Sequence, residues 1–298
     1  MPELPEVESV RRWLAPFLEG RRFERVEISD ERLTRPFDPV TVARELEGER
    51  VAAVDRRGKY LIVRFESGRA LLIHLRMTGS LRLYDRGDGV PADPYGRAVV
   101  RLDDGSDVAY RDVRRFGTWL LLEPGESEPY LATRVGDEPL DTLFTAARLG
   151  ERLAGRRTTL KAALLDQRTL AGMGNIYVDE ALWRARLNPL RPAAGLDRNE
   201  LRRLHRGIRA ALEHGLARQG STLRDYRLPD GSGGSMQSEF RVYGRRDEPC
   251  DRCGTTIART HIAGRTTWFC ATCQPERPAQ AASSSSRRPS RSRRQSSV

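Results

Sequence analysis

The chain opens with Met1-Pro2-Glu3-Leu4-Pro5-Glu6-Val7-Glu8, and this stretch decides how the remaining residues are interpreted. Because Pro2 is small and stiff, bacterial processing is expected to remove the methionine before it. The mature chain would then begin with a secondary amine. An α-amine titrates near ~7.7–8, so a useful fraction is unprotonated at neutral pH and can attack a sugar carbon to form an iminium. The alternative is that Pro2 is an ordinary start residue.

The residues that follow this opening stretch predict an amphipathic helix, because apolar side chains recur at helical spacing and Gly20 is placed to end the helix. These side chains are Val7, Val10, Trp13, Leu14, Phe17 and Leu18. The terminal amine would therefore be held on a packed element and not on a loose tail.

A series of short β-type runs with tight turns between them follows, and it indicates an antiparallel sandwich or barrel that ends near residue 135. The runs are Tyr60–Phe65, Ala70–Leu75, Ala98–Leu102, Val108–Arg111 and Thr118–Leu122.

The period of the apolar residues becomes helical after the last of these runs. Helices are expected to begin at Asp141, at Thr158 or Thr159, and at Asp197, where Glu200 completes a capping-box pattern. The second part of the chain is therefore predicted to be helical.

The chain has 298 residues, which is long enough for two domains and a large core. Its formal charge is +11, and all of its 52 cations except Lys59 and Lys161 are arginines. Five arginines lie in residues 279–298, which leaves +6 for the body (11 − 5). This excess fits a phosphate-rich partner, and it also fits many ordinary proteins. The Ser/Arg/Pro tail has little to bury and is expected to be disordered.

Two classes of function have no support in the sequence. It contains no apolar run of about eighteen residues and no charged-then-apolar leader, so we expect a cytoplasmic protein that is not inserted in a membrane. It also contains no Gly-rich loop followed by Lys-Ser or Lys-Thr, so we expect neither nucleotide hydrolysis nor a nucleotide cofactor.

All four cysteines fall within 24 residues, as Cys250-x2-Cys253, sixteen residues, and Cys270-x2-Cys273. Paired knuckles at this spacing can hold one Zn²⁺ tetrahedrally, with Zn–S distances of ~2.3 Å. Two disulfides are the alternative, which is disfavoured in a chain without a secretion signal. Four sulfur ligands close the site, so the zinc is expected to fold a small β hairpin. His261 is not needed as a ligand.

Three motifs of this chain occur together in one family. They are Pro2-Glu3-Leu4-Pro5-Glu6, Gly172-Met173-Gly174-Asn175-Ile176-Tyr177 and the four-cysteine finger. Over residues 1 to about 275 the chain resembles the bacterial formamidopyrimidine-DNA glycosylases, base-excision enzymes for oxidised purines. The resemblance implies an α+β multidomain fold. Its parts are an N-terminal β-sandwich with a leading helix at 1–135, a helix–two-turn–helix domain at 136–228, a lesion loop with a zinc-finger hairpin at 229–277, and a tail at 278–298.

The resemblance also assigns catalytic roles. Pro2 would form a Schiff base with the damaged nucleotide, Glu3 would act as general acid on the opening sugar oxygen, and Lys59 would assist β-elimination. Lys59 could instead be a solvated charge. However, nearly every other cation in this chain is arginine, so a lysine is expected where a titratable ammonium matters. For Glu6 we favour a cap of the first helix. Arg265 matches an arginine assigned both as phosphate clamp and as proton donor in δ-elimination; arginine is a poor acid, which favours the clamp.

Further matches concern the DNA. Met77, Arg114 and Phe116 match a trio that fills the gap left by an extruded base, although without the resemblance Met77 and Phe116 would be assigned to the core. Asn175 matches a phosphate contact at a helix N-terminus, where the neighbouring glycines let the backbone approach the anion. Asparagine is also a good N-cap, so a structural role for Asn175 is an alternative.

Several positions depart from the family pattern or match it weakly. Arg156 and Tyr95 align with further DNA contacts, but Tyr95 replaces a usual histidine. Arg76 replaces a usual glycine and Val113 a usual proline, which puts the shape of the two gap-filling loops in doubt. Residues 221–243 resemble a loop that closes over the everted base, and a plain connector is the alternative.

The expected partner is double-stranded DNA with an oxidised base, bound by a monomer. Two other functions compete with this hypothesis. A non-catalytic zinc-ribbon DNA-binding protein would explain the charge and the finger but not Pro2, Glu3 or Lys59. An endonuclease VIII-like glycosylase for oxidised pyrimidines typically begins Pro-Glu-Gly-Pro-Glu, whereas this chain has Leu4. We therefore expect the purine enzyme.

Overall fold

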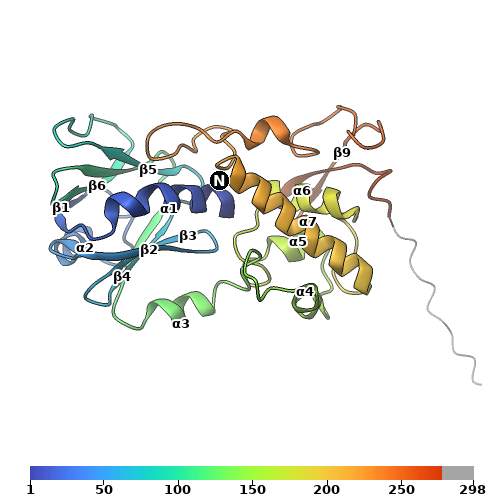
Figure 1. Ribbon diagram of the computed structural model, residues 1–298, viewed down its shortest axis with the longest axis horizontal. Helices are drawn as coiled ribbons and strands as arrows, with labels where there is room; N and C mark the ends of the chain where they lie inside the picture. The colour runs from blue at the N-terminus through green and yellow to red at the C-terminus, as the bar shows by residue number, and fades with distance from the viewer. Residues whose placement is uncertain (277–298) are drawn as a thin grey trace, which may run out of the picture.

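Residues 1–276 are described by the computed structural model shown in Figure 1; the predicted tail lies outside them. The first part of the chain contains α1 (Leu4–Leu18), β1 (Phe23–Ile28), α2 (Pro39–Leu46), β2 (Val51–Arg57), β3 (Tyr60–Phe65), β4 (Ala70–His74), β5 (Gly79–Tyr84), β6 (Gly96–Leu102), β7 (Asp107–Asp112), β8 (Thr118–Leu122) and α3 (Ser127–Ala132). The second part contains α4 (Ala146–Leu153), α5 (Leu160–Leu165), α6 (Asn175–Ala185), α7 (Arg198–Ala217), the short 3-10 helix η1 (Met236–Glu239), β9 (Ala258–Ile262) and β10 (Arg265–Phe269).

Strands β1 to β8 form a sandwich of two antiparallel four-stranded sheets, with strand orders β1-β6-β7-β5 and β2-β3-β4-β8, and β9 pairs with β10 in a separate two-stranded hairpin. The main core lies between the sheets and under α1. All five residues of β4 are buried, because its other face packs with Ile62 and Leu122 against Leu131 of α3. This double burial explains the unbroken apolar run that marked β4 in the sequence. The predicted sandwich is confirmed.

The second part is helical, as predicted, and α6 packs along α7. The capping box of α7 is present: Glu200 N–H donates to Asp197 Oδ1 at 2.9 Å, and Asp197 N–H donates to Glu200 Oε2 at 2.9 Å. Thr159 caps α5 as expected. The helix expected at Asp141 was wrong. That helix starts at Ala146, because Thr145 accepts the Arg148 N–H and so provides the cap.

The amino-terminal segment belongs to both parts of the molecule, and Figure 1 shows the N-terminus between them. Leu14 of α1 lies in the sandwich core, whereas Leu4 at the start of the same helix lies in the core of the helical part. The Leu4 N–H donates to Gly172 O at 3.0 Å. Gly172 has φ +77, and a Cβ placed on it would lie 2.6 Å from the Leu4 Cβ. The chain therefore needs glycine here for both conformation and space.

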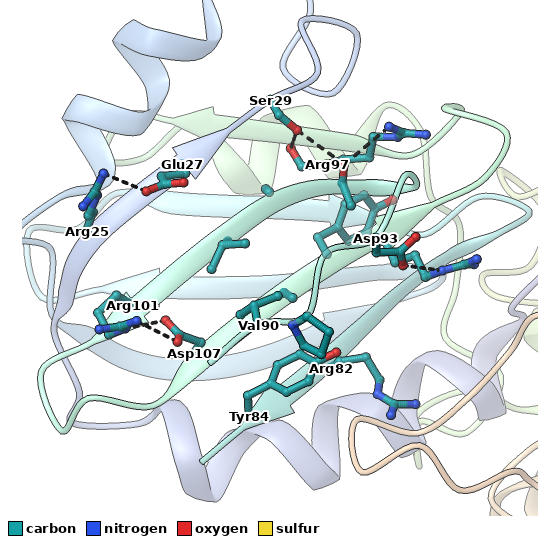
Figure 2. A pocket seen from close by; sticks show the side chains of 17 residues that line it. Arg25, Glu27, Ser29, Arg82, Tyr84, Val90, Asp93, Arg97, Arg101 and Asp107 are labelled. Carbon is teal, nitrogen blue, oxygen red and sulfur yellow. Dashed lines mark hydrogen bonds and ion pairs between the residues drawn. The ribbon is translucent and has the colours of Figure 1, made fainter. Parts of the chain in front are cut away.

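A depression of about 440 Å³ lies on the outer face of the β1-β6-β7-β5 sheet (Figure 2). Several of its charged side chains pair with one another: Arg101 of β6 with Asp107 of β7, Arg111 of β7 with Asp93 of the preceding loop at 2.7 Å, and Arg25 with Glu27 within β1 at 2.8 Å. None of the residues predicted to be catalytic lines it.

Within residues 1–276, no helix combines the length and the apolar character needed to cross a membrane.

Replacing Gly172 with alanine should destabilise the protein by about 2–4 kcal/mol, because left-handed strain and overpacking against Leu4 add. Gly155 provides a matched control. It has φ +69, but no atom lies within 4 Å of the point that its Cβ would occupy, so Gly155→Ala should lose only about 1 kcal/mol. Urea unfolding of both variants measures the difference. Equal losses would show that contact with the amino-terminal segment contributes nothing.

Candidate active site

The carboxylate of Glu3 sits at the start of α6. Its Oε1 accepts the Ile176 N–H at 3.0 Å and its Oε2 accepts the Tyr177 N–H at 3.3 Å. Gly174 leaves the room for this, since a Cβ there would overlap the Glu3 carboxylate carbon. The first free N–H groups and the positive end of the helix dipole thus stabilise a carboxylate of the same chain. Gly172 and Gly174 make room for Leu4 and Glu3. The phosphate contact expected at this segment stays a prediction.

Glu3 and Lys59 form a buried, electrostatically coupled pair. Burial raises the pKa of Glu3, and the charge of Lys59 partly opposes this shift. Lys59 is 6% exposed; burial lowers the pKa of its ammonium, Glu3 and Glu6 oppose the change, and Arg265 reinforces it. Both shifts favour neutral forms at physiological pH relative to free side chains. Lys59 is therefore not the solvated strand-start charge that was the alternative from the sequence.

Glu6 connects three segments at this point. Its Oε2 accepts the Glu3 N–H at 2.9 Å, which confirms the predicted cap of α1. Its Oε1 accepts the Tyr177 hydroxyl at 2.8 Å and the Ser221 N–H at 2.8 Å. The same carboxylate thus holds the start of α1, the first turn of α6 and the beginning of the 221–243 segment.

Pro2 is buried directly beside Glu3, whereas Met1 is 45% exposed. In the chain with Met1 the Pro2 nitrogen is a peptide nitrogen and carries no lone pair available for attack. Removal of the exposed Met1 would convert it into a secondary amine without moving any packed element.

The predicted gap-filling residues lie together and project from the sandwich. Arg114 Nη1 lies 2.9 Å from Met77 Sδ, and its guanidinium stacks 4.8 Å from the centre of the Phe116 ring. Met77 and Phe116 are 36% and 51% exposed, so neither is a core residue. Buried Asp112 fixes the loop, because it accepts the Gly117 N–H at 2.7 Å and the Thr78 hydroxyl.

Asn175 faces the finger hairpin rather than capping its own helix. It is the first residue of α6, its Nδ2 donates to Thr266 O at 2.9 Å, and the N-cap position is Gly174. The N-cap alternative is therefore wrong. Arg265 directly precedes Thr266 at the start of β10 and is exposed. Burial has the largest effect on the pKa of Lys59, and the charge of Arg265 lowers this pKa further.

Lys161 anchors the finger hairpin to the helical part, a role that the sequence did not reveal. Its Nζ lies 2.7 Å from Asp179 Oδ1 and donates to Thr266 O at 3.2 Å, and both ionic side chains are fully buried. Asp179 Oδ2 accepts the Trp268 N–H at 3.0 Å. Lys161 thus shares its carbonyl acceptor with Asn175 and positions the strand that carries Arg265. Its rarity as one of two lysines was the only signal.

His74 was also missed. Its Nδ1 accepts the Arg76 N–H at 3.0 Å, so a neutral ring carries its proton on Nε2 and can donate there. Burial, followed by the charges of Arg76 and Lys59, lowers the pKa of His74 to about 3. The ring packs edge-on against Tyr60, with centroids 4.9 Å apart. A histidine that stays neutral can offer one fixed donor beside Lys59.

Tyr95 and Arg156 are engaged elsewhere. Arg111 of β7 stacks on the ring of Tyr95, the residue before β6, at 4.8 Å. Arg156 pairs with Asp166 at 2.9 Å and donates to Arg152 O at 3.0 Å. These interactions do not connect Tyr95 or Arg156 to the Glu3–Lys59 pair. The DNA contacts expected of the two residues stay predictions.

The four cysteines converge as the spacing predicted. All four sulfur atoms lie within 4.8 Å of one another, with Cys250–Cys273 and Cys253–Cys270 separations of 4.0 and 3.4 Å. Tetrahedral ligands at ~2.3 Å from zinc are about 3.8 Å apart, so the residues fit the ion. The Trp183 Nε1–H of α6 donates to Cys250 Sγ at 3.4 Å. One structural zinc would therefore join the finger to the helical part.

Family models match three successive regions of the chain. They are the formamidopyrimidine-DNA glycosylase N-terminal domain at residues 1–119, the formamidopyrimidine-DNA glycosylase H2TH domain at residues 135–227, and a zinc finger found in FPG and IleRS at residues 247–275.

Individual relatives agree with these models. The formamidopyrimidine-DNA glycosylase of Symbiobacterium thermophilum is 48% identical over 276 residues, which cover 92% of this chain and 90% of the relative. The crystal structure of the MutM (FPG) protein from Thermus thermophilus superposes with a TM-score of 0.82 at 43% identity, covering 93% of this chain and all of that one. A Lactococcus lactis FPG mutant in complex with Fapy-dG-containing DNA gives a TM-score of 0.85 at 37% identity, covering 92% and 100%. The chain belongs to the formamidopyrimidine-DNA glycosylase family.

Proposed function

We propose that this protein excises oxidised purines from duplex DNA and cuts the strand at the resulting site, using the amine of Pro2 as nucleophile. The observation that carries the proposal is the burial of Pro2, Glu3 and Lys59 at the junction of the two parts. A solved relative bound to Fapy-dG-containing DNA supports the substrate class. Since the substrate is chromosomal DNA, the protein would work at the bacterial nucleoid.

The first chemical step exchanges two bonds at the anomeric carbon. The Pro2 amine forms a bond to this carbon, and the glycosidic bond to the damaged base breaks. The Glu3 carboxyl, whose pKa burial raises, can then give a proton to the sugar oxygen as the ring opens. The Pro2 nitrogen gives up its own proton, which neutralises the departing base. The product is an open-chain iminium between Pro2 and the sugar.

Strand cleavage follows from the electron demand of this iminium. The proton on the neighbouring sugar carbon becomes acidic, and its removal expels the phosphate on the 3′ side; a second elimination expels the 5′ phosphate. Burial lowers the pKa of Lys59, which increases the fraction of neutral amine that can accept the first proton. A non-catalytic DNA-binding protein would have no use for this buried, titratable pair.

Access to the base requires its extrusion from the duplex. The exposed side chains of Met77 and Phe116 can fill the space left in the stack, and Arg114, which contacts both, can donate hydrogen bonds to the orphaned base. Asn175 and Arg265 would hold the phosphates beside the lesion. The position of these residues supports this assignment, because Asn175 donates to Thr266 O and Arg265 directly precedes Thr266 in the chain.

The packing of Leu4 favours a glycosylase for oxidised purines over an endonuclease VIII-like glycosylase for oxidised pyrimidines. This side chain is fully buried in the helical core, at a position where the pyrimidine enzymes typically have glycine. Leu4 therefore holds the amino terminus by a packing contact that a glycine at this position could not make.

Borohydride should trap the processed protein covalently on duplex DNA that holds 8-oxoguanine opposite cytosine, because it reduces the iminium to a stable amine. Protein that retains Met1, or carries an amino-terminal extension, should not be trapped and should not cut the strand. Trapping is measured by gel shift under denaturing conditions. Trapping only on thymine glycol or dihydrouracil duplexes would disprove the purine assignment, and trapping of the blocked protein would disprove the role of Pro2.

Lys59→Arg should separate the two chemical steps. The guanidinium keeps a positive charge but cannot lose its proton near neutral pH, so strand cleavage of an abasic duplex should slow by about 10²–10⁴-fold while borohydride trapping persists. In the wild type, the cleavage rate should rise with pH over a range below the ordinary lysine pKa, because burial lowers the pKa of Lys59. The rising limb should be absent in the variant. Unchanged cleavage in Lys59→Arg would exclude this residue as the base.

A further inference from the structure

The amino-terminal half of α7 carries an arginine stripe that the proposed reaction does not use. Arg198, Arg202 and Arg206 lie four residues apart, so they share one face of the helix, and all three are exposed. No ion pair joins any of them to an acid within residues 1–276. Like charges at this spacing repel one another and destabilise a helix. An anion bound along the arginine stripe would relieve this repulsion.

A hollow of about 590 Å³ opens beside the arginine stripe. It is lined by Ala146, Asn199, Arg202, Arg203, His205 and Arg206. Among the described residues, this lining contains three arginines and no acid. The arginines of α4 differ, because Arg148 and Arg152 both pair with Asp137, at 2.9 and 2.7 Å. The hollow thus presents positive charge that the protein itself does not neutralise.

An exposed leucine lies next to the hollow on an anchored turn. Leu143 is 83% exposed, and its N–H donates to Asp141 Oδ1 at 2.8 Å. The carbonyl of the following residue, Phe144, accepts a hydrogen bond of 2.7 Å from Nε2 of His205 in the hollow. Arg209 of α7 donates to Asp141 O at 3.1 Å. The turn is therefore fixed to α7 and holds an apolar side chain in water beside the cations.

This surface lies away from the Glu3–Lys59 pair. Gly215, near the other end of α7, faces Tyr177 of α6 so closely that a Cβ on it would lie 2.4 Å from the tyrosine ring, and the Tyr177 N–H is bound by Glu3. Residues 198–206 lie about 14–26 Å from Gly215 along the helix axis. Figure 1 shows the N-terminus beside one end of α7 and the other end of the helix at the far side of the helical part. A partner on the arginine stripe would therefore not cover the Glu3–Lys59 pair.

We propose that the arginine stripe and Leu143 form a docking surface for an acidic segment of another protein, in which an apolar side chain lies among aspartates or glutamates. The carboxylates would pair with Arg202 and Arg206 at the hollow, and the apolar side chain would cover Leu143. A second DNA duplex is the other anion that could bind here. Its phosphate backbone neutralises arginines but offers no apolar surface, so the exposed leucine favours a peptide.

The test titrates the full-length protein with a short fluorescent peptide that repeats Asp-Glu-Leu. The wild type should bind this peptide, and high salt should weaken the binding because it screens exposed charges. Arg202→Glu combined with Arg206→Glu should weaken the binding about tenfold or more, since attraction becomes repulsion. Arg44→Glu combined with Arg86→Glu is the control: it changes the net charge equally at two exposed arginines of the sandwich part, and should alter the binding by less than about twofold.

Leu143→Ser tests the apolar part of the surface. It should weaken binding of the Asp-Glu-Leu peptide about threefold or more, and should leave binding of a peptide with serine in place of leucine unchanged. A photoreactive leucine in the first peptide should cross-link to residues 139–146 or to α7, as mass spectrometry of the digested protein would show. Absence of wild-type binding, equal losses in the two double variants, or cross-links confined to residues 277–298 would overturn the proposal.

The same variants titrated with DNA decide between a peptide and a second duplex. The probe is a duplex that holds a tetrahydrofuran abasic-site analogue. The Arg202 and Arg206 double variant should bind it as the Arg44 and Arg86 control does. A larger loss of duplex affinity than in the control, together with no effect of Leu143→Ser on peptide binding, would make the arginine stripe a DNA contact and overturn the peptide assignment. None of these measurements requires catalysis, so they are independent of the proposed function.

Discussion

The hydrogen bonds from the first turn of α6 to the Glu3 carboxylate are the interaction on which the rest of the site depends. They tie the third residue of the chain to a helix that begins more than 170 positions later. Leu4, next to Glu3, packs in the helical core, while the remainder of α1 packs in the sandwich. The amino terminus therefore serves as the joint between the two parts, and a terminal nucleophile that would otherwise fray is held rigid.

This joint also sets the electrostatics. Bringing Glu3 and Lys59 out of water is unfavourable for both charges, and their mutual attraction offsets only part of the penalty. The remaining penalty appears as opposite pKa shifts, upward for the acid and downward for the amine. Such shifts suit a reaction that needs a proton donor and a proton acceptor at nearly the same place. The burial that makes these two charged groups unfavourable therefore also shifts their pKa values in the directions that proton transfer needs.

The DNA-facing groups are held by carboxylates and by carbonyl oxygens that lie behind them. Asp112 fixes the loop of Arg114 and Phe116, and Glu6 fixes Ser221 at the start of the predicted lesion loop. Thr266 O receives donors from both Lys161 and Asn175, which joins the finger hairpin to α6. Buried groups such as Asp112, Glu6 and Lys161 thus hold the segments that carry the exposed DNA-facing side chains. These buried groups have partners within the protein.

Local patterns in the sequence determined the strands β3 and β8, the caps of α5 and α7, and the cysteine cluster, because each depends on neighbours close in the chain. The start of α4 was misplaced, since Asp141 and Thr145 are both good caps and only packing selects between them. The Pro2-Glu3 motif and Lys59 identified the chemistry, but they lie more than fifty residues apart in the sequence, which does not show that Glu3 and Lys59 are buried together. Only the tertiary structure decided that Gly174 makes room for Glu3, that Asn175 and Lys161 meet at Thr266, and that Arg156 is paired. Those facts depend on which distant segments occupy the same space, and burial and charge pairing act through space rather than along the chain.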